Sequence, residues 1–164
     1  MNLNSLRDLF LHELQDLYSA EMQLLDALPK MAEAAASTDL ENAFREHLVL
    51  TEGHVARLKE IFTSLDAEAS NHTCEAMKGL IKEGEAYIKA GGSAEVRDAA
   101  LIGAAQRVEH YEMAGYGTAR AIARRLGEHQ IAELLQMTLD EEASADEVLT
   151  DIAEAHVNID ASTA

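Results

Sequence analysis

Apolar side chains recur every third or fourth residue over four long stretches of the 164-residue chain. This spacing places them on one side of an α-helix, and each stretch is far longer than a usual strand of about four to eight residues. The sequence therefore predicts helices over about residues 4–31, 40–65, 94–126 and 128–156. Pro29, the one proline, is expected to kink or end the first helix.

The segment between the second and third helices, about residues 66–93, has a different composition and is rich in glycine. It carries only a short helical pattern and is too short to form its own core, which favours a crossover with a short helix over a second domain. Two helical hairpins joined by a long connection form a four-helix bundle of the ferritin-like kind. We therefore expect an all-α, ferritin-like bundle, with residues 1–164 as a single domain.

The chain is strongly acidic, with 30 Asp and Glu against 13 Lys and Arg. Such a surface repels phosphate backbones and anionic lipids, so it argues against nucleic acid and membrane surfaces as partners and favours cations. The chain shows neither the apolar core of a signal peptide nor a membrane span. The lone Cys74 excludes an internal disulfide and fits a reducing compartment. The sequence predicts a cytoplasmic protein.

Several acidic and histidine side chains lie on the apolar faces of the first two helices. With about 100° of rotation per residue, Glu21 lies roughly 30° and Glu13 roughly 50° from the centre of the first apolar face. In the second helix, His47 lies within about 20° and His54 within about 40° of the centre. Asp16 lies more than about 100° away and is not counted among the inward carboxylates.

The third and fourth helices repeat this pattern. Glu112 lies near the centre of the third apolar face and Glu109 about 60° from it. In the fourth helix, Glu142 lies about 30° and Asp146 about 70° from the centre. Tyr116 also faces inward, where it either packs in the core or hydrogen-bonds a carboxylate. Because a buried carboxylate without a partner costs several kcal/mol, converging carboxylates would protonate, repel one another or bind a cation.

The inward polar groups are also expected at the same level along the bundle axis. If the first hairpin turns near residue 35, Glu21 lies close to His47, and if the second turns near Gly127, Glu112 lies opposite Glu142. Carboxylates with one or two histidines midway along a bundle are the ligand set for two iron or manganese ions. Taken singly, such a histidine is also compatible with a hydrogen-bonded core residue, and an edge glutamate with a side chain that reaches water.

Five segments of the chain resemble the YciE/YciF-type family of ferritin-like bacterial stress proteins, and the similarity covers essentially the whole sequence. The segments are ELQDLYSAEMQLLDALPKM, AFREHLVLTEGHVARL, CEAMKGLIKEGE, DAALIGAAQRVEHYEMAGYGTA and LLQMTLDEEASADEVL. The resemblance implies a cytoplasmic four-helix bundle, commonly dimeric, with a di-iron site.

Similarities to a more distant protein indicate which residues would be metal ligands. SAEMQ is similar to the first-helix segment of rubrerythrin that carries a ligand glutamate, which corresponds to Glu21. The pair Glu109 and Glu112 resembles the paired glutamates of rubrerythrin's third long helix. The chain departs from ferritin-like iron enzymes in lacking an inward Glu-x-x-His in the second and fourth helices. The missing motifs weaken the expectation of iron oxidation more than they weaken the expectation of the fold.

The hypothesis from the sequence is a non-haem, di-iron or iron/manganese-binding protein of the bacterial stress response, with oxidant-dependent iron oxidation as its possible chemistry. The alternative is a structural or interaction protein with a degenerate metal site and no catalysis. The expected partners are metal ions and a second copy of the chain in a homodimer. The predicted ligands are Glu21, His47, Glu109, Glu112 and Glu142, with Asp146, Glu13 and His54 as additional candidates.

Overall fold

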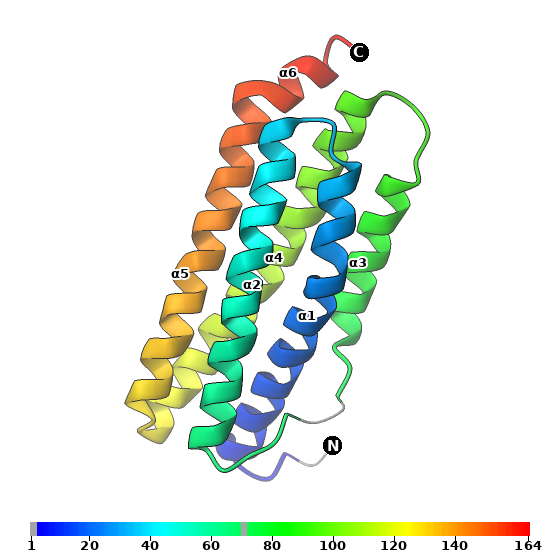
Figure 1. Cartoon of the computed structure of the whole chain (residues 1–164). Coiled ribbons are helices and arrows are strands. Elements are labelled where there is room, and N and C mark those ends of the chain that lie inside the picture. The colour runs from blue at the N-terminus through cyan, green and yellow to red at the C-terminus, as the bar shows by residue number, and fades with distance from the viewer. Residues whose placement is uncertain (1–2, 70–71) are drawn as a thin grey trace.

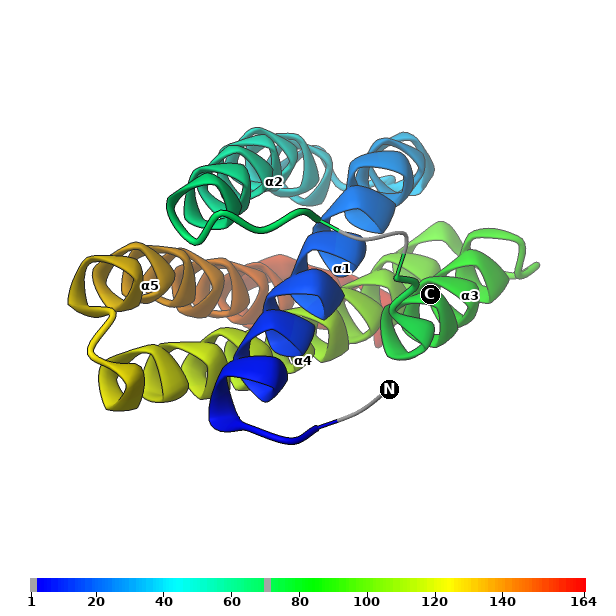
Figure 2. The same ribbon diagram turned by 90° about the horizontal axis from the view of Figure 1, so that it is seen from below.

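Four long helices run side by side, and a shorter fifth helix packs outside them (Figures 1 and 2). The computed structural model describes residues 3–69 and 72–164, and no strand occurs within them. The elements are α1 (Leu6–Ala34), α2 (Thr38–Ser64), α3 (Glu75–Ile88), α4 (Ala94–Leu126), α5 (His129–Ile152), a π-helical turn (Ala153–Val157) and α6 (Asn158–Ala161). The prediction of an all-α bundle with a short helix in its crossover is confirmed. No helix of these described residues is both long and apolar enough to cross a bilayer.

Local sequence signals account for where the long helices begin and end. The hydroxyl groups of Ser5, Ser37 and Ser93 each accept a backbone N–H bond from the first turn of α1, α2 and α4, respectively. These bonds satisfy donors that a helix start otherwise leaves unpaired. Gly127 ends α4 with φ of 81°, a conformation that glycine adopts without steric cost.

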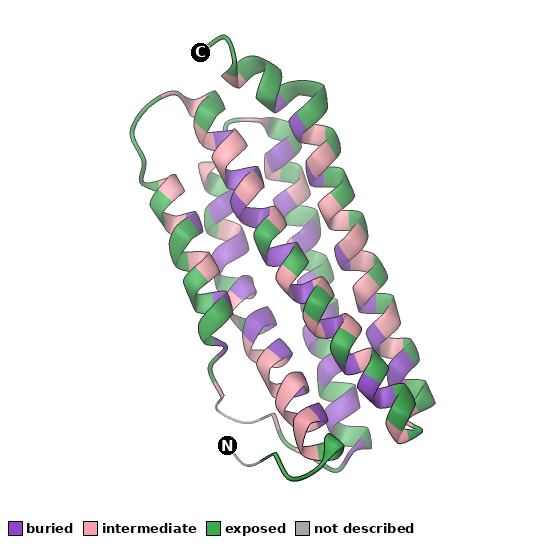
Figure 3. Cartoon of the chain, turned by 180° about the vertical axis from the view of Figure 1, so that it is seen from behind, coloured by how far each residue is buried: buried purple, intermediate pink, exposed green. Residues whose placement is uncertain are grey.

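The apolar core is divided into two clusters, one towards each end of the bundle. One cluster contains Leu24, Phe44 and Leu149, and the other contains Phe10 and Leu58, with further residues in each. Figure 3 shows buried positions along the inner sides of the helices. On α2, α4 and α5, the acidic and histidine residues predicted to face inward lie between these two clusters in sequence, and on α1 Glu21 lies at their junction. The fold therefore places a polar layer between two apolar ones.

The chain stays helical beyond two of the expected helix ends. Helix α1 continues through Pro29 to Ala34, because buried Met31 and Ala32 pack in the core beyond the proline. This packing outweighs the hydrogen bond that a proline removes, at a typical cost of about 3 kcal/mol. The fourth predicted helix, about residues 128–156, is followed by further helical structure: a π-helical turn with Val157 buried in the core, and then α6.

Candidate metal centre

Six buried side chains from all four long helices meet in the polar layer. They are Glu21 of α1, His47 and His54 of α2, Glu109 and Glu112 of α4, and Glu142 of α5. They form two groups that share Glu142, and within each group one donor atom of every residue lies within 4.8 Å of the others. One group contains His47, Glu109, Glu112 and Glu142, and the other contains Glu21, His54 and Glu142.

Helical spacing explains why these side chains share a face. Glu109 and Glu112 are three residues apart, so they lie on adjacent turns of the same side of α4. His47 and His54 are seven residues apart, which is two turns of α2, and their rings lie 6.3 Å apart between centroids. Both rings therefore point into the bundle at successive levels.

The first group has donor atoms without hydrogen-bond partners. Nε2 of His47 lies 3.5 Å from Oε1 of Glu109 and 3.6 Å from Oε2 of Glu142. Within the part of the chain that the structure describes, neither ring nitrogen of His47 and neither carboxyl oxygen of Glu112 has a hydrogen-bond partner. A buried polar atom left in this way typically costs about 1–3 kcal/mol. The donor set fits a cation, which would satisfy these atoms together.

The second group is organised around His54. Its Nδ1 lies 3.0 Å from Oε1 of Glu142 and 3.3 Å from Oε1 of Glu21. Tyr116 packs in the core and its hydroxyl group donates a hydrogen bond to Glu21, so both interpretations of this inward tyrosine are confirmed. Glu142 belongs to both groups, with its Oε2 towards His47 and its Oε1 towards His54.

Burial dominates the electrostatics of the carboxyl groups. It raises the pKa of Glu109 and Glu112 well above the usual range, and neighbouring carboxylates raise it further. Burial also raises the pKa of Glu21, against the opposing effect of His54. For Glu142, burial acts in the same sense, but the contacts with His54 and His47 outweigh it and lower the pKa. The cluster therefore favours protons or other cations.

The two histidines differ in charge. Burial lowers the pKa of His47, so its imidazole is neutral at pH 7 and its ring can serve as a ligand. Burial would also lower the pKa of His54, but the close contacts with Glu142 and Glu21 outweigh it and raise the pKa to about 10. The His54 imidazolium thus supplies one positive charge among the acids.

A charged pair on the outer side of His54 orients its ring. Nε2 of His54 lies 2.9 Å from Oε2 of Glu141, and Nη1 of Arg57 donates to the same oxygen at 2.9 Å. Arg57 also donates to Thr138. Metal-binding histidines commonly bond a carboxylate through their second nitrogen in this manner. Sequence reasoning missed this pair, although Arg57 lies one turn after His54 on the same helix.

Two of the additional candidates lie outside both groups. Asp146 accepts a bond of 3.1 Å from Nε2 of Gln106, and its other oxygen lies 3.3 Å from Nε2 of His110. Glu13 lines a separate pocket between α1 and α4. Asp146 stands at the edge of its apolar face, and its partners come from the neighbouring α4. Of the three additional candidates, only His54 is brought together with the main set.

Asp16 lies outside both groups, as its direction on α1 predicts, but it has partners of its own. Its Oδ2 accepts a bond from the hydroxyl of Tyr111, and its Oδ1 lies 2.9 Å from Nε2 of His72. The Tyr111 hydroxyl also lies 3.0 Å from Sγ of the buried Cys74. The crossover covers this side of α1. The angular positions of residues around a single helix do not reveal such a neighbour.

Comparison with known proteins identifies the family. Residues 5–162 match the family model described as "Domain of unknown function (DUF892)". The chain belongs to this family. It is 45% identical over 159 residues to Protein YciF of Escherichia coli (strain K12), covering 96% of each chain.

Solved structures of relatives agree with this membership. The crystal structure of the E. coli stress protein YciF matches with a TM-score of 0.92 and 44% identity, covering 95% of this chain and 99% of that one. YcfI of Rhodopseudomonas palustris, suggested to be a structural protein, matches with a TM-score of 0.88 and 40% identity, covering 91% and 95%. These DUF892 relatives share the helical bundle described above.

Proposed function

We propose that this DUF892 protein binds two metal ions, iron or iron with manganese, in the polar layer of its bundle and acts in the stress response. The observation that carries the proposal is the set of buried donor atoms from six residues, shared between two groups through Glu142. The role in stress rests on the similarity to YciF, which is described as a stress protein.

The chemistry of the donor set supports the choice of metal. One ion would be held by His47, Glu109, Glu112 and Glu142, and the other by Glu21, His54 and Glu142. Four carboxylates with two imidazoles suit iron and manganese, whereas structural zinc sites prefer a tetrahedral set rich in cysteine and histidine. Cys74, the one cysteine of the chain, belongs to neither group.

Bound iron would supply redox chemistry, in which oxygen or peroxide oxidises Fe(II). The protein's own part is to present the ligands in a buried site and to handle their protons. Glu109 and Glu112 hold protons more tightly than exposed acids do, and they release them when a cation takes their place. The Arg57–Glu141 pair keeps Nδ1 of His54 directed at Glu142.

Elemental analysis tests this function. Protein purified from aerobic, iron-replete cells should carry about two iron or manganese ions per chain. Glu142→Gln, which removes the shared ligand, should reduce the metal content to well below one ion, and Glu147→Gln on the exposed side of α5 should leave it unchanged. Metal below about 0.1 per chain in the unmodified protein, with stability unchanged by a chelator, would refute the proposal.

A structural or interaction protein remains the second candidate function, and one observation favours it. The His54 imidazolium already contacts both Glu21 and Glu142, so part of the acid cluster is balanced without any metal. The similar protein YcfI is suggested to be structural. In that case Glu142→Gln would lower the stability of the protein equally with and without added metal, because it removes a partner of the His54 imidazolium and no bound ion depends on the side chain.

A further inference from the structure

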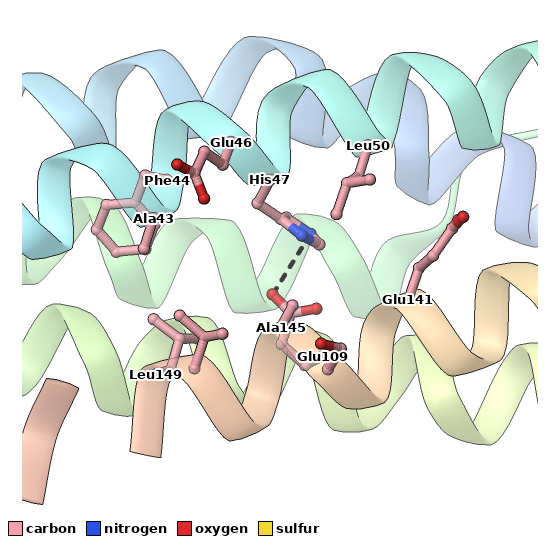
Figure 4. A pocket seen from close by; sticks show the side chains of 11 residues that line it. Ala43, Phe44, Glu46, His47, Leu50, Glu109, Glu141, Ala145 and Leu149 are labelled. Atoms are coloured by element: carbon pink, nitrogen blue, oxygen red, sulfur yellow. Dashed lines mark ion pairs between the residues drawn. The ribbon is translucent and has the colours of Figure 1, made fainter. Parts of the chain in front are cut away.

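A pocket of about 220 Å³ lies between α2 and α5 and reaches from the surface to the polar layer (Figure 4). Most of its wall is apolar. The apolar residues are Ala43, Phe44 and Leu50 from α2 and Ala145, Val148 and Leu149 from α5. The apolar surface continues to the rim, where Leu50 and Val148 remain exposed. A water-filled channel for hydrated ions would instead be lined by polar groups.

Two candidate ligands form the inner end of this pocket. His47 and Glu109 line it, and Figure 4 shows both side chains directed into it from opposite sides. His47 is 6% exposed and Glu109 is 3% exposed. Among the described residues, neither ring nitrogen of His47 nor Oε2 of Glu109 has a hydrogen-bond partner. The apolar walls therefore converge on buried polar atoms that lack partners.

The size of the pocket limits what it accepts. A single water molecule needs only about 10–15 Å³ of such space, whereas pockets for drug-sized ligands measure about 300–1,000 Å³. A helix of a partner protein is about 10–12 Å across with its side chains and would not enter. The volume of about 220 Å³ fits an organic molecule about the size of one substituted ring.

The charged residues around the pocket further limit the class of ligand that it accepts. Glu46 and Glu141 line the pocket along with Glu109, and all three disfavour an anion. Two divalent ions would bring four positive charges, which equal the four negative charges of Glu21, Glu109, Glu112 and Glu142. A loaded centre is then close to neutral, Glu141 is already paired with Arg57 and Glu46 is exposed, so an incoming charged group would lack a counter-charge at the buried end of the pocket.

We propose that this pocket binds a small, neutral organic molecule, with its apolar body against Phe44 and Leu149 and its polar end at His47 and Glu109. This inference rests on the proposed function, because the polar end lies beside the proposed metal. The apolar contacts require no metal. The proposed metal centre would thus have a class of organic ligand, in addition to its metal ions.

Three test ligands of similar shape and different charge examine the proposal: benzyl alcohol, benzoate and benzylammonium. We expect benzyl alcohol to shift the methyl NMR signals of Ala43, Ala145 and Leu149 in a saturable manner, in both metal-loaded and chelator-treated protein. Benzoate and benzylammonium should bind the metal-loaded protein at least about tenfold more weakly. Equal binding of all three ligands, or shifts spread over the whole surface, would overturn the inference.

Substitutions locate the site. Ala145→Phe fills the pocket and should weaken benzyl alcohol binding by at least about tenfold, whereas Ala114→Phe on exposed α4 surface should not change it. If Ala145→Phe fails to fold, Leu50→Asn at the rim serves instead and should weaken binding in the same direction. Unchanged binding in the folded variant would overturn the inference.

Metal content measured on the same samples separates the two proposals. Normal metal with no benzyl alcohol binding would contradict the pocket inference and leave the proposed function standing. Benzyl alcohol binding in protein that takes up no metal would contradict the proposed function and retain the apolar pocket. A pocket covered by a second copy of the chain would show no binding and a dimer that Ala145→Phe dissociates, which also overturns the inference.

Discussion

Nδ1 of His54 lies 3.0 Å from Oε1 of Glu142, and both side chains are completely buried. The contact joins α2 to α5 in the middle of the bundle. Because His54 carries a proton there, its imidazolium acts as a cation for Glu142 and Glu21. An arriving metal ion would replace that proton. The predictions below follow from this competition and from the packing around it.

Stability without metal should fall as the pH rises. The pKa of His54 is raised from 6.5 to about 10 in the fold, so its stabilising contribution is complete below pH 6.5 and is lost as the pH rises through about 10. The raised pKa values of Glu109 and Glu112 act in the same direction. Urea unfolding in chelator should show this decrease, and His54→Asn should flatten it. A free energy of unfolding that increases over this interval would contradict the assignment.

Glu112→Gln distinguishes a metal ligand from an unused acid. In chelator, removing a fully buried acid should stabilise the fold at neutral pH by about 1–3 kcal/mol, since no charge then needs burial. In metal-loaded protein, the same change should lower metal content and reduce the stability that metal confers. Parallel urea titrations with and without metal measure both effects. Equal stabilisation under both conditions would show that Glu112 is no ligand.

Arg57→Met should weaken metal binding without removing a ligand. The variant frees Glu141 and releases the ring of His54, and losses of such supporting contacts typically reduce metal affinity about 10–100-fold. Arg45→Met is the matched control, because Arg45 pairs with Glu41 on the exposed side of the same helix. Competition with a chromophoric chelator gives the affinities. The same affinity in both variants would assign Arg57 a purely structural role.

Asp16 should stabilise the fold through its bonds in the crossover. Burial alone would raise its pKa, but hydrogen bonds from Tyr111, Cys74 and His72 outweigh burial and lower it. Its contribution is therefore present above the ordinary value of 3.8 and is lost as the pH falls through the lower value of the folded state. Asp16→Asn should lose about 1 kcal/mol at pH 7. The difference from the unmodified protein should shrink in acid, and a constant difference would disprove the charge effect.

Two neighbouring glycines of α4 should respond oppositely to alanine. A Cβ at Gly115 would lie 2.8 Å from Cδ2 of Leu17, which is buried and cannot move freely, so Gly115→Ala should destabilise the fold. A Cβ at Gly117 would meet no described atom within 4 Å. Gly117→Ala should therefore gain about 0.5–1 kcal/mol from helix propensity, as thermal unfolding would show. Stabilisation by both changes would contradict the close approach of α1 and α4.

Much of the fold is predictable because its helices are long and strongly periodic. The bounds of α4 agree with the prediction, and those of α2 differ by two residues at its start and one at its end. Pro29 does not end α1, because the residues that follow it pack in the core, which a local rule does not take into account. The short α6 has too few residues to carry a periodic signal. Its helical form depends on contacts with the rest of the bundle.

The candidate site was predictable where the direction in which a side chain points from its own helix decides which residues it meets. Glu21, His47, Glu112 and Glu142 lie close to the centres of their apolar faces, and the structure brings them together. Asp146 stands nearer an edge, where its partner is set by an adjacent helix. The Arg57–Glu141 pair joins two helices, and no pattern within either helix specifies that pairing.

Anomalous X-ray scattering from crystals of the metal-loaded protein, recorded at the iron and manganese edges, tests the central claim most directly. The account predicts two peaks inside the bundle on either side of the Glu142 carboxylate. One peak should lie among His47, Glu109 and Glu112, and the other beside Glu21 and His54. Two well-occupied peaks at these places would agree with the account. No peak in the polar layer of a crystal grown with excess metal would contradict it.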